Sequence, residues 1–247
     1  MSSSTPETHR STRRQRQNFV SASFKSYLYK LLNNAAPGGS TVNTATGFSG
    51  DGLATINNLI LILLQRVVAN VNRLLLAEPD RKTISVEHVQ AAVKLTLPPK
   101  MAATANRSAT QAINRYCART TKSASAARTS SASTTRTTKS TSAAEEKSEA
   151  VTARGTRAGL ILPVTRIERI MMELAVAPRK GTTTGVCLAA VLEVVFARLL
   201  SETGAVAERN HKIRITPRHL KIAILESMDF STLFRGVVLA GGVLPPQ

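Results

Sequence analysis

The chain of 247 residues is strongly basic, with 33 lysines and arginines against 15 aspartates and glutamates and a net charge of +18 at pH 7. Its length suits two domains of about 100 residues each plus linkers, and its charge indicates a polyanionic partner, above all nucleic acid. Two isolated cysteines exclude a disulfide framework, and the uninterrupted run of leucine and isoleucine at residues 59–64 is too short to span a bilayer.

Residues 1–18 are polar and carry four arginines, Arg10, Arg13, Arg14 and Arg16. This composition predicts a disordered basic arm, which serves either as a solubilising tail or as a contact to nucleic acid. A first helix follows over residues 19–36, where apolar side chains recur at helical spacing and Pro37 with two glycines ends the pattern. Its predicted buried side chains are Phe24, Tyr27, Leu28, Leu31 and Leu32.

A long helix is predicted over residues 53–76, because apolar residues recur there at steps of three and four. Ser85 is a good N-cap for a third helix that reaches about Leu97, and two prolines separate it from a fourth helix over residues 100–118. Residues 119–151 are mostly Ser, Thr and Ala with scattered charges, a composition typical of a flexible tether. As a random coil such a tether spans roughly 30 Å.

The second part of the chain predicts a similar series of elements. A helix over residues 163–174 and a loop precede a long apolar helix that starts near Gly185. A basic extended loop follows, in which Lys212 and Arg214 alternate with isoleucines. Thr216 and Pro217 then start a short helix, and a turn follows near Asp229.

The two parts contain the same unit. Residues 84–89, ISVEHV, correspond to residues 215–220, ITPRHL, and each follows a long apolar helix and a basic loop. The sequence therefore predicts a tandem repeat of one helical unit, whose loops and helix N-termini suit phosphate. His88 and His219 occupy equivalent positions in the repeat, which favours a structural role over metal binding.

Several blocks carry a resemblance to a known family. Residues 154–247 resemble a core histone of type 2A through RGTRAGLILPVTRI, LAAVLE, RITPRHLKIAI and GGVLPPQ. Residues 16–118 resemble type 2B through SYLYKLL, RKTISVEHVQAAVKL and QAINRY. The order 2B then 2A is similar to the fused histone doublets of Marseillevirus-like giant viruses. The resemblance implies an all-α protein of two tandem histone folds (helix–loop–long helix–loop–helix) that pair as an intramolecular handshake dimer.

This resemblance implies four domains: the arm 1–18, a 2B-like fold over 19–118, the linker 119–151, and a 2A-like fold over 152–247. Against cellular type 2B, residues 40–46 are an insertion in the first loop. The segment Gly241, Gly242, Val243, Leu244 and Pro245 corresponds to the part of type 2A that docks on the companion histones of types 3 and 4. Those histones and double-stranded DNA are the expected partners, and no membrane or small-molecule substrate is expected.

Residue-by-residue matching also implies the DNA contacts, which would read backbone position and DNA deformability rather than base sequence. The expected residues of the 2A half are Arg154, Arg157, Arg166, Arg169, Arg179, Lys212 and Arg214. Those of the 2B half are Ser49, Arg81, Lys82 and Thr83, with Arg13, Arg14 and Arg16 in the arm.

The sequence departs from the family at the cluster of carboxylates that receives basic peptides. Glu193 and Asp229 remain as a residual acidic patch, whereas Arg198, Ser201, Ser227 and Met228 replace four other members in the 2A half. In the 2B half Lys100 and Ser108 replace two more. We therefore expect basic peptides not to be attracted to this face.

The sequence gives catalysis no support, because it has no phosphate-cradling glycine loop, no GxSxG motif and no metal-ligand spacing of Cys and His. No cofactor or metal is expected. Two alternatives to a nucleosomal histone stay open, a histone-fold transcription regulator and a non-nucleosomal protein that condenses DNA. The expected location is chromatin, in a virion, a viral factory or a host nucleus.

Overall fold

The computed structural model describes residues 23–35, 47–78, 81–129 and 154–237. The described chain is largely helical, so the predicted all-α class is confirmed. The N-terminal half comprises α2 (Lys25–Ala35), α3 (Gly50–Ala77), α4 (Val86–Thr96) and α5 (Pro99–Thr129). The C-terminal half comprises α6 (Arg154–Ala158), α7 (Val164–Leu174), α8 (Thr184–Arg209), α9 (Pro217–Glu226) and α10 (Met228–Leu233). In each half a long apolar helix, α3 or α8, thus lies between a shorter helix before it and a shorter helix after it in sequence, as the repeat predicted. In the N-terminal half the 31-residue α5 then follows.

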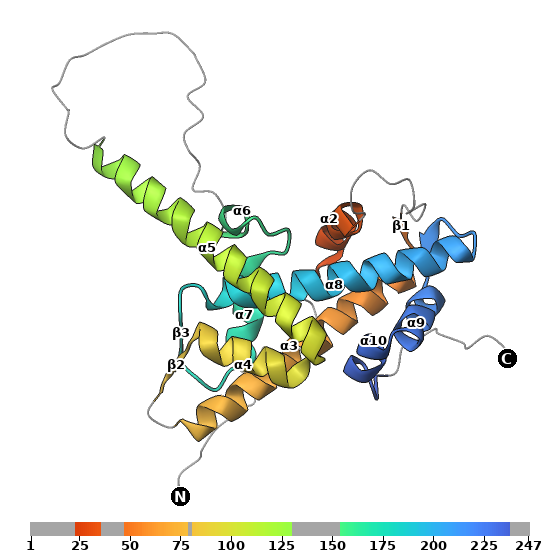
Figure 1. Cartoon of the computed structure of the whole chain (residues 1–247), viewed down its shortest axis with the longest axis horizontal. Coiled ribbons are helices and arrows are strands. Elements are labelled where there is room, and N and C mark those ends of the chain that lie inside the picture. Colours follow the sequence, from red (N-terminus) through yellow and green to blue (C-terminus); the bar gives the residue numbers. More distant parts are fainter. Residues whose placement is uncertain (1–22, 36–46, 79–80, 130–153, 238–247) are drawn as a thin grey trace, which may run out of the picture.

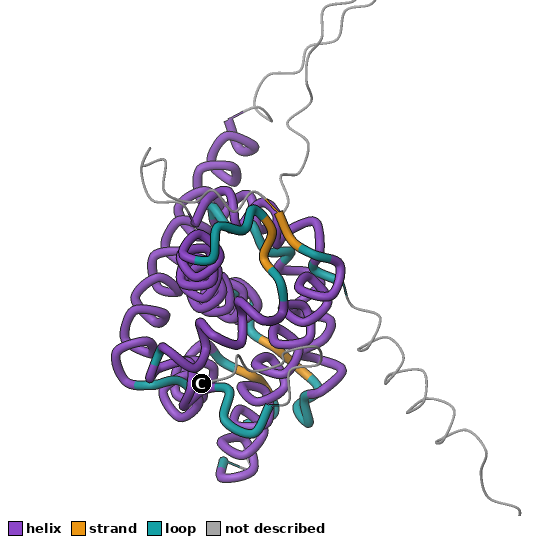
Figure 2. Tube along the Cα trace, turned by 90° about the vertical axis from the view of Figure 1, so that its right-hand side faces the viewer, coloured by secondary structure: helices purple, strands orange, loops and turns teal. Residues whose placement is uncertain are grey.

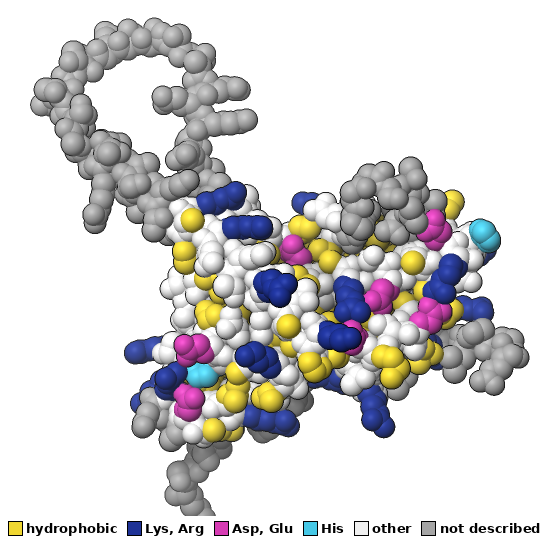
Figure 3. Space-filling view, in the orientation of Figure 1, with side chains coloured by type: hydrophobic (Ala, Val, Ile, Leu, Met, Phe, Trp, Pro, Cys, Tyr) yellow, Lys and Arg dark blue, Asp and Glu magenta, His cyan; other side chains and the backbone are white. Residues whose placement is uncertain are grey.

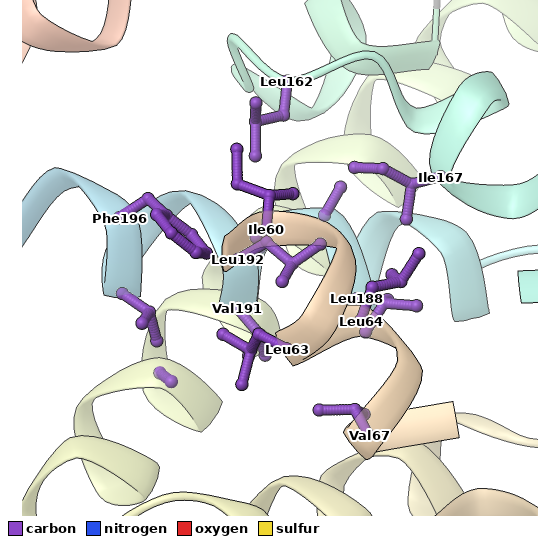
Figure 4. Packing of buried hydrophobic residues seen from close by; sticks show 14 of the residues in the cluster. Ile60, Leu63, Leu64, Val67, Leu162, Ile167, Leu188, Val191, Leu192 and Phe196 are labelled. Atoms are coloured by element: carbon purple, nitrogen blue, oxygen red, sulfur yellow. The ribbon is translucent and has the colours of Figure 1, made fainter. Parts of the chain in front are cut away.

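The two long helices, α3 and α8, cross in the middle of the molecule (Figure 1). Ile60, Leu63, Leu64 and Val67 of α3 lie close to Leu188, Val191, Leu192 and Phe196 of α8, with Leu162 and Ile167 packed above them (Figure 4). The buried apolar side chains of both halves form one continuous core. Neither half therefore buries its apolar stripe without the other.

Both long helices are long and apolar enough, by length and composition alone, to cross a membrane. Within the molecule, however, 50% of the most apolar window of α3 and 72% of that of α8 are buried. Such burial is typical of the central helices of a globular core.

Four two-residue strands join the halves in two parallel pairs. β1 (Gly47–Phe48) pairs with β4 (Arg214–Ile215), and β2 (Thr83–Ile84) pairs with β3 (Arg179–Lys180). The two pairs lie apart from each other (Figure 2), at opposite ends of the crossed long helices. In both pairs a loop that precedes a long helix in one half meets a loop that follows the long helix in the other.

Burial of α8 extends beyond the apolar stripe that helical spacing predicts for it. The residues of this predicted stripe are Val186, Ala189, Leu192, Val195, Phe196, Leu199 and Leu200. All residues of α8 from Thr184 to Leu192 are buried, because α5 lies across it on the side opposite α3 (Figure 1). The face of α5 toward this contact consists largely of small side chains, which let the helices approach closely. Its buried residues are Met101, Ala102, Ala105, Ala109, Ala112 and Tyr116.

The largest differences from the expected helix boundaries lie in three places. Helix α2 begins at Lys25 rather than at residue 19, and residues 19–22 lie outside the described chain. Helix α5 extends to Thr129, eleven residues into the range assigned to the linker, because extending a formed helix through a stretch with several alanines needs no new nucleus. The rest of that range up to residue 151 lies outside the described chain. Helix α6 was not predicted.

Tertiary contacts explain the short helix α6. It packs on α5, where the Arg119 guanidinium donates a hydrogen bond to the carbonyl of Thr156 at 2.8 Å, and its Ala158 is fully buried. Five residues give too few backbone hydrogen bonds to form a helix alone, so the sequence pattern holds no local signal for it.

Polar side chains also join the halves. The Asn72 amide donates to the carbonyl of Leu174 at 2.9 Å and accepts from the N–H of Val176 at 3.1 Å. The Arg66 guanidinium donates to the carbonyls of Leu233 and Arg235, where α10 ends. Cationic donors suit the unsatisfied carbonyls at a helix C-terminus. Arg66 therefore tethers α10 to α3.

Candidate nucleic-acid interface

The end of the molecule at β1 and β4 is built by a turn that reverses the chain after α8. His211 adopts a left-handed backbone conformation, with φ of 52°. Its N–H bonds to the carbonyl of Glu208 at 2.8 Å, and the N–H of Lys212 bonds to that of Ala207 at 2.9 Å. These two bonds are those of a Schellman motif, which stops the helix and directs the chain into the extended segment 212–215.

In this extended segment the predicted alternation is incomplete, because the apolar side chain of Ile213 is exposed like that of Lys212. Arg214 is exposed and Ile215 is fully buried. Gly47 and Phe48 pair with these two residues, and the N–H of Ser49 bonds to the carbonyl of Ile215 at 2.9 Å. The surface here is hollowed, with a volume of about 640 Å³, and its lining includes Lys212, Arg214 and Arg218. The fold therefore places Arg214 beside the N-terminal loop, which is distant in sequence, and Lys212 and Arg218 line the same hollow as Arg214.

Ser49, expected among the DNA contacts, has a second role in the structure. Its hydroxyl accepts the N–H of Gly52 at 3.1 Å and so caps the N-terminus of α3. A Cβ on Gly52 would lie 2.6 Å from the carbonyl oxygen of Ile215, so only glycine permits this approach. The cap and the glycine together fix the position of the first loop against β4.

The opposite end, at β2 and β3, uses the same construction. Thr83 pairs with Arg179 and Ile84 with Lys180, and the N–H of Gly181 bonds to the Ile84 carbonyl at 2.9 Å. The sequence-predicted residues Arg81, Lys82, Thr83 and Arg179 are all exposed here. Arg81 forms ion pairs with Glu78 at 3.1 Å and Glu87 at 3.9 Å.

A buried carboxylate lies beside this second strand pair. The side chain of Glu168, on α7, is only 8% exposed, and both its oxygens accept hydrogen bonds from the Arg154 guanidinium at 3.0 Å. Lys180, whose side chain turns inward from β3, forms an ion pair with the same carboxylate. Gly185 leaves room for this cluster, because a Cβ there would overlap the side chain of Glu168. Arg154, expected to support DNA binding, is thus held by an internal anion.

A third basic site lies where α2 and α7 begin. The Arg166 guanidinium donates to the carbonyl of Ser23, just before α2, and lies over the rings of Phe24 and Tyr27 at 5.9 and 5.8 Å. A hollow of about 390 Å³ opens beside the first turn of α7, with Lys30 and Arg154 in its lining. Arg169 is exposed on α7, and Arg157 is half-buried on α6.

The two residual acidic residues are each engaged within the molecule. The Glu193 carboxylate accepts the backbone N–H groups of Ile161 at 2.8 Å and Leu162 at 3.1 Å. Burial raises the pKa of Glu193, and the two backbone hydrogen bonds act in the opposite direction. Asp229 forms an ion pair with Arg198 at 3.0 Å, and the same arginine pairs with Glu202 at 3.0 Å.

Both repeat histidines cap a helix. The Nδ1 atom of His88 accepts the N–H of Ser85 at 3.0 Å, and that of His219 accepts the N–H of Thr216 at 3.3 Å. Each ring is almost fully buried. Within the described residues no group of three or more His, Cys, Asp or Glu side chains is placed to hold a metal ion. The structural role inferred from the repeat matches this geometry.

Three functional features were missed by sequence reasoning. Lys180 and Arg218 adjoin predicted contacts in sequence, and that adjacency was their only signal. Glu168 gave no signal, because its cationic partners lie 14 and 12 residues away in sequence. Two groups of predicted residues, Arg13, Arg14 and Arg16 in the arm and the segment 241–245, lie outside the described chain.

Lysines and arginines are spread over the face of the molecule seen in Figure 3, with acidic side chains between them. Positive charge is therefore not confined to one continuous patch on this face. The cations that adjoin backbone N–H groups and helix N-termini are those at the two strand pairs and at the start of α7. These positions are the geometric candidates for phosphate.

Comparison with known proteins finds a family match in the C-terminal half of the chain. Residues 139–225 match the histone family, described as the core histone domain of types 2A, 2B, 3 and 4. Histone macroH2A1.1 of Capsaspora owczarzaki is 44% identical over 94 residues, which are 38% of this chain and 26% of that protein. The chain thus spans about a quarter of the length of this curated relative. The similarity to core histones therefore lies in the C-terminal part of the chain, residues 139–225.

Proposed function

We propose that this histone-fold protein packages double-stranded DNA by binding its sugar–phosphate backbone without reading the base sequence. One observation carries the proposal: each end of the crossed long helices joins a loop from each half and exposes an arginine there. Arg214 is exposed beside Gly47, and Arg179 is exposed beside Thr83. Backbone-directed binding needs cations at fixed spacing along a curved surface and needs no contact to base edges.

The two halves act as a 2B-like and a 2A-like fold that pair within one chain as a handshake dimer. Paired strands at both ends and one continuous core support this pairing. A covalent connection between α5 and α6 would keep the second half at an effective concentration of roughly millimolar and enforce equal stoichiometry. The order of the halves makes a viral histone doublet of the Marseillevirus-like kind the proposed identity.

The proposed partners are histones of types 3 and 4, which would complete a nucleosome-like particle. In this proposal the segment 241–245 docks on that pair, and Arg13, Arg14 and Arg16 add DNA contacts from the arm. Arg157, Arg166 and Arg169 contribute at the third basic site. The particle would act in chromatin of a virion, a viral factory or a host nucleus.

Reconstitution with type 3 and type 4 histones, followed by nuclease digestion, tests the proposal. The expected result is protection of a discrete DNA length on duplexes of unrelated sequence. A continuous smear of fragments would instead indicate a condensing protein, and protection of one preferred sequence would indicate a transcription regulator. Either result contradicts the proposal.

Proteolysis tests the pairing of the halves separately. A protease site placed within residues 130–151 allows the chain to be cut between α5 and α6. We expect the two fragments to remain together in gel filtration, because they share one core. Separate elution of folded fragments would contradict the handshake pairing.

A further inference from the structure

The two strand pairs differ in how their cations are neutralised. At β1 and β4, the described residues place Lys212, Arg214 and Arg218 at the surface hollow, and none of the three forms an ion pair within the described chain. Asp51, in the first turn of α3, is the carboxylate nearest in sequence to β1, and it too forms no ion pair with a described residue. These three positive charges are therefore not paired with a carboxylate of the described residues.

At β2 and β3, acidic side chains already bind most of the cations. Glu78 and Glu87 pair with Arg81, and Glu168 pairs with Arg154 and Lys180. Among the described cations of this end, Lys82 and Arg179 are the ones without an ion pair to a described residue. The Glu78 and Glu87 carboxylates are 49% and 83% exposed, so solvent screens their ion pairs.

Glu168 differs from these surface carboxylates because it is buried. Its carboxylate is removed from water, and the electrostatic attraction that it exerts is screened much less than that of an exposed group. Breaking a buried pair leaves an uncompensated buried charge, which is strongly unfavourable. A phosphate that recruits Arg154 or Lys180 would have to break such a pair.

The positions of the two cations make this competition direct. The side chains of Arg154 and Lys180 are 40% and 27% exposed, so both remain reachable from solvent. Lys180 is next to Arg179 on β3, and Arg154 also lines the hollow at the start of α7. Without Glu168, both charges would therefore lie within the basic surface proposed for DNA.

We infer that Glu168 withholds Arg154 and Lys180 from DNA phosphate, so that the β1–β4 end binds DNA more strongly than the β2–β3 end. This inference rests on the proposed function and adds a determinant of where along the protein the DNA is held. It predicts that a wrapped duplex detaches first at the β2–β3 end. Glu168 is a positioning residue in this scheme, since it acts on DNA only through its two cations.

The salt dependence of DNA affinity tests the inference, because it reports how many phosphates the protein neutralises. Each neutralised phosphate contributes about 0.9 to the magnitude of the slope of log affinity against log salt concentration. The full chain is titrated onto a fluorescent duplex of arbitrary sequence at several potassium chloride concentrations. K212Q/R214Q should lower the magnitude of the slope by about 1.8, and R154Q/K180Q should change it by less than about half of that. Equal losses for the two pairs would overturn the inference.

Glu168→Gln provides the complementary measurement. It keeps the side-chain volume beside Gly185 and releases two cations that can turn toward solvent, so the magnitude of the slope should rise by about one to two. Glu202→Gln is the matched control: it makes the same change in net charge at Arg198 and should leave the slope within about half a unit of the wild type. An E168Q slope no larger than that of E202Q would contradict the inference.

The variant R154Q/K180Q leaves the buried Glu168 carboxylate unpaired and can therefore unfold. The triple variant E168Q/R154Q/K180Q removes the carboxylate as well, and it should bind DNA with the slope of the wild type. A slope lowered by about 1.8 in the triple variant would mean that both cations bind phosphate in the wild type. Loss of the proposed function gives a different result, a wild-type chain whose weak DNA affinity is unaffected by K212Q/R214Q.

Discussion

The backbone N–H of Thr216 donates to Nδ1 of His219 at 3.3 Å, which fixes the turn between β4 and α9. The acceptor role requires a neutral imidazole. Burial lowers the pKa of His219, and the nearby Arg218 and Lys212 charges lower it further, against a hydrogen bond to the backbone of Arg214 that raises it. Protonation would thus remove one of the contacts that form the β1–β4 end.

The first prediction is that His219 makes the protein less stable in mild acid. Since its pKa is lower in the folded than in the unfolded chain, the unfolded chain binds more protons between the two values. The contribution of neutral His219 to folding stability is therefore complete above about pH 6.5, and it declines as the pH falls through the pKa of His219 in the folded chain. His219→Gln keeps an acceptor for the Thr216 N–H, as in a capping box, and should lose less stability between pH 7 and pH 5. Urea unfolding at each pH measures this, and equal losses would contradict it.

The second prediction concerns the space that Gly185 leaves for Glu168. Gly185→Ala places a methyl group within the volume of the Glu168 side chain and should destabilise the protein by about 1–3 kcal/mol. Gly47→Ala is the matched control, since no atom lies within 4 Å of its added Cβ. In the double variant G185A/E168A the overlap disappears, so the two effects in urea unfolding should not add. Additive losses of unfolding free energy would contradict the prediction, because they would show that the added methyl group does not overlap the Glu168 side chain.

The third prediction tests the polar contact between the halves at Asn72. Its amide satisfies a carbonyl and an N–H where α7 ends, so Asn72→Ala should cost about 1–3 kcal/mol of unfolding free energy. Asn114→Ala, at an exposed position of α5, should change it by less than about 0.5 kcal/mol. Chemical denaturation compares the two, and a neutral N72A variant would mean that water replaces both bonds at no cost.

The fourth prediction is that the face around Glu193 and Asp229 does not bind arginine-anchored basic peptides. Glu193 is occupied by two backbone N–H groups, and Arg198 holds Asp229 while placing a positive charge beside it. Isothermal titration calorimetry with such a peptide should show no binding at micromolar concentrations. Saturable binding that is lost in D229N would contradict the prediction.

The fifth prediction is that the two cysteines differ in reactivity. Burial raises the pKa of Cys187 to about 12, so its thiol is neutral and inaccessible at pH 8, whereas Cys117 is exposed. A chromogenic disulfide reagent should modify Cys117 in the native protein and both cysteines in denaturant. Rapid modification of Cys187 in the C117S variant under native conditions would contradict the burial of α8.

Local patterns in the sequence determined the helices, their caps and the repeat. Ser85 and Thr216 start α4 and α9 as predicted, because capping acts over three residues. The predicted stripe of α8, from Val186 to Leu200, is buried throughout, because helical periodicity alone decides which side chains share a face. The tandem arrangement of two such units could also be predicted, because the two units have similar residues at corresponding positions of the sequence.

Only the tertiary structure decided what lies against those faces and which charges remain available. The packing of α5 across α8 buries Cys187 and Ala190 outside the predicted stripe, and α6 forms only against α5. The capture of Arg154 and Lys180 by Glu168 brings together three residues from α6, α7 and β3. A basic residue looks the same in the sequence whether solvent or a buried carboxylate surrounds it, because its surroundings come from elements distant along the chain.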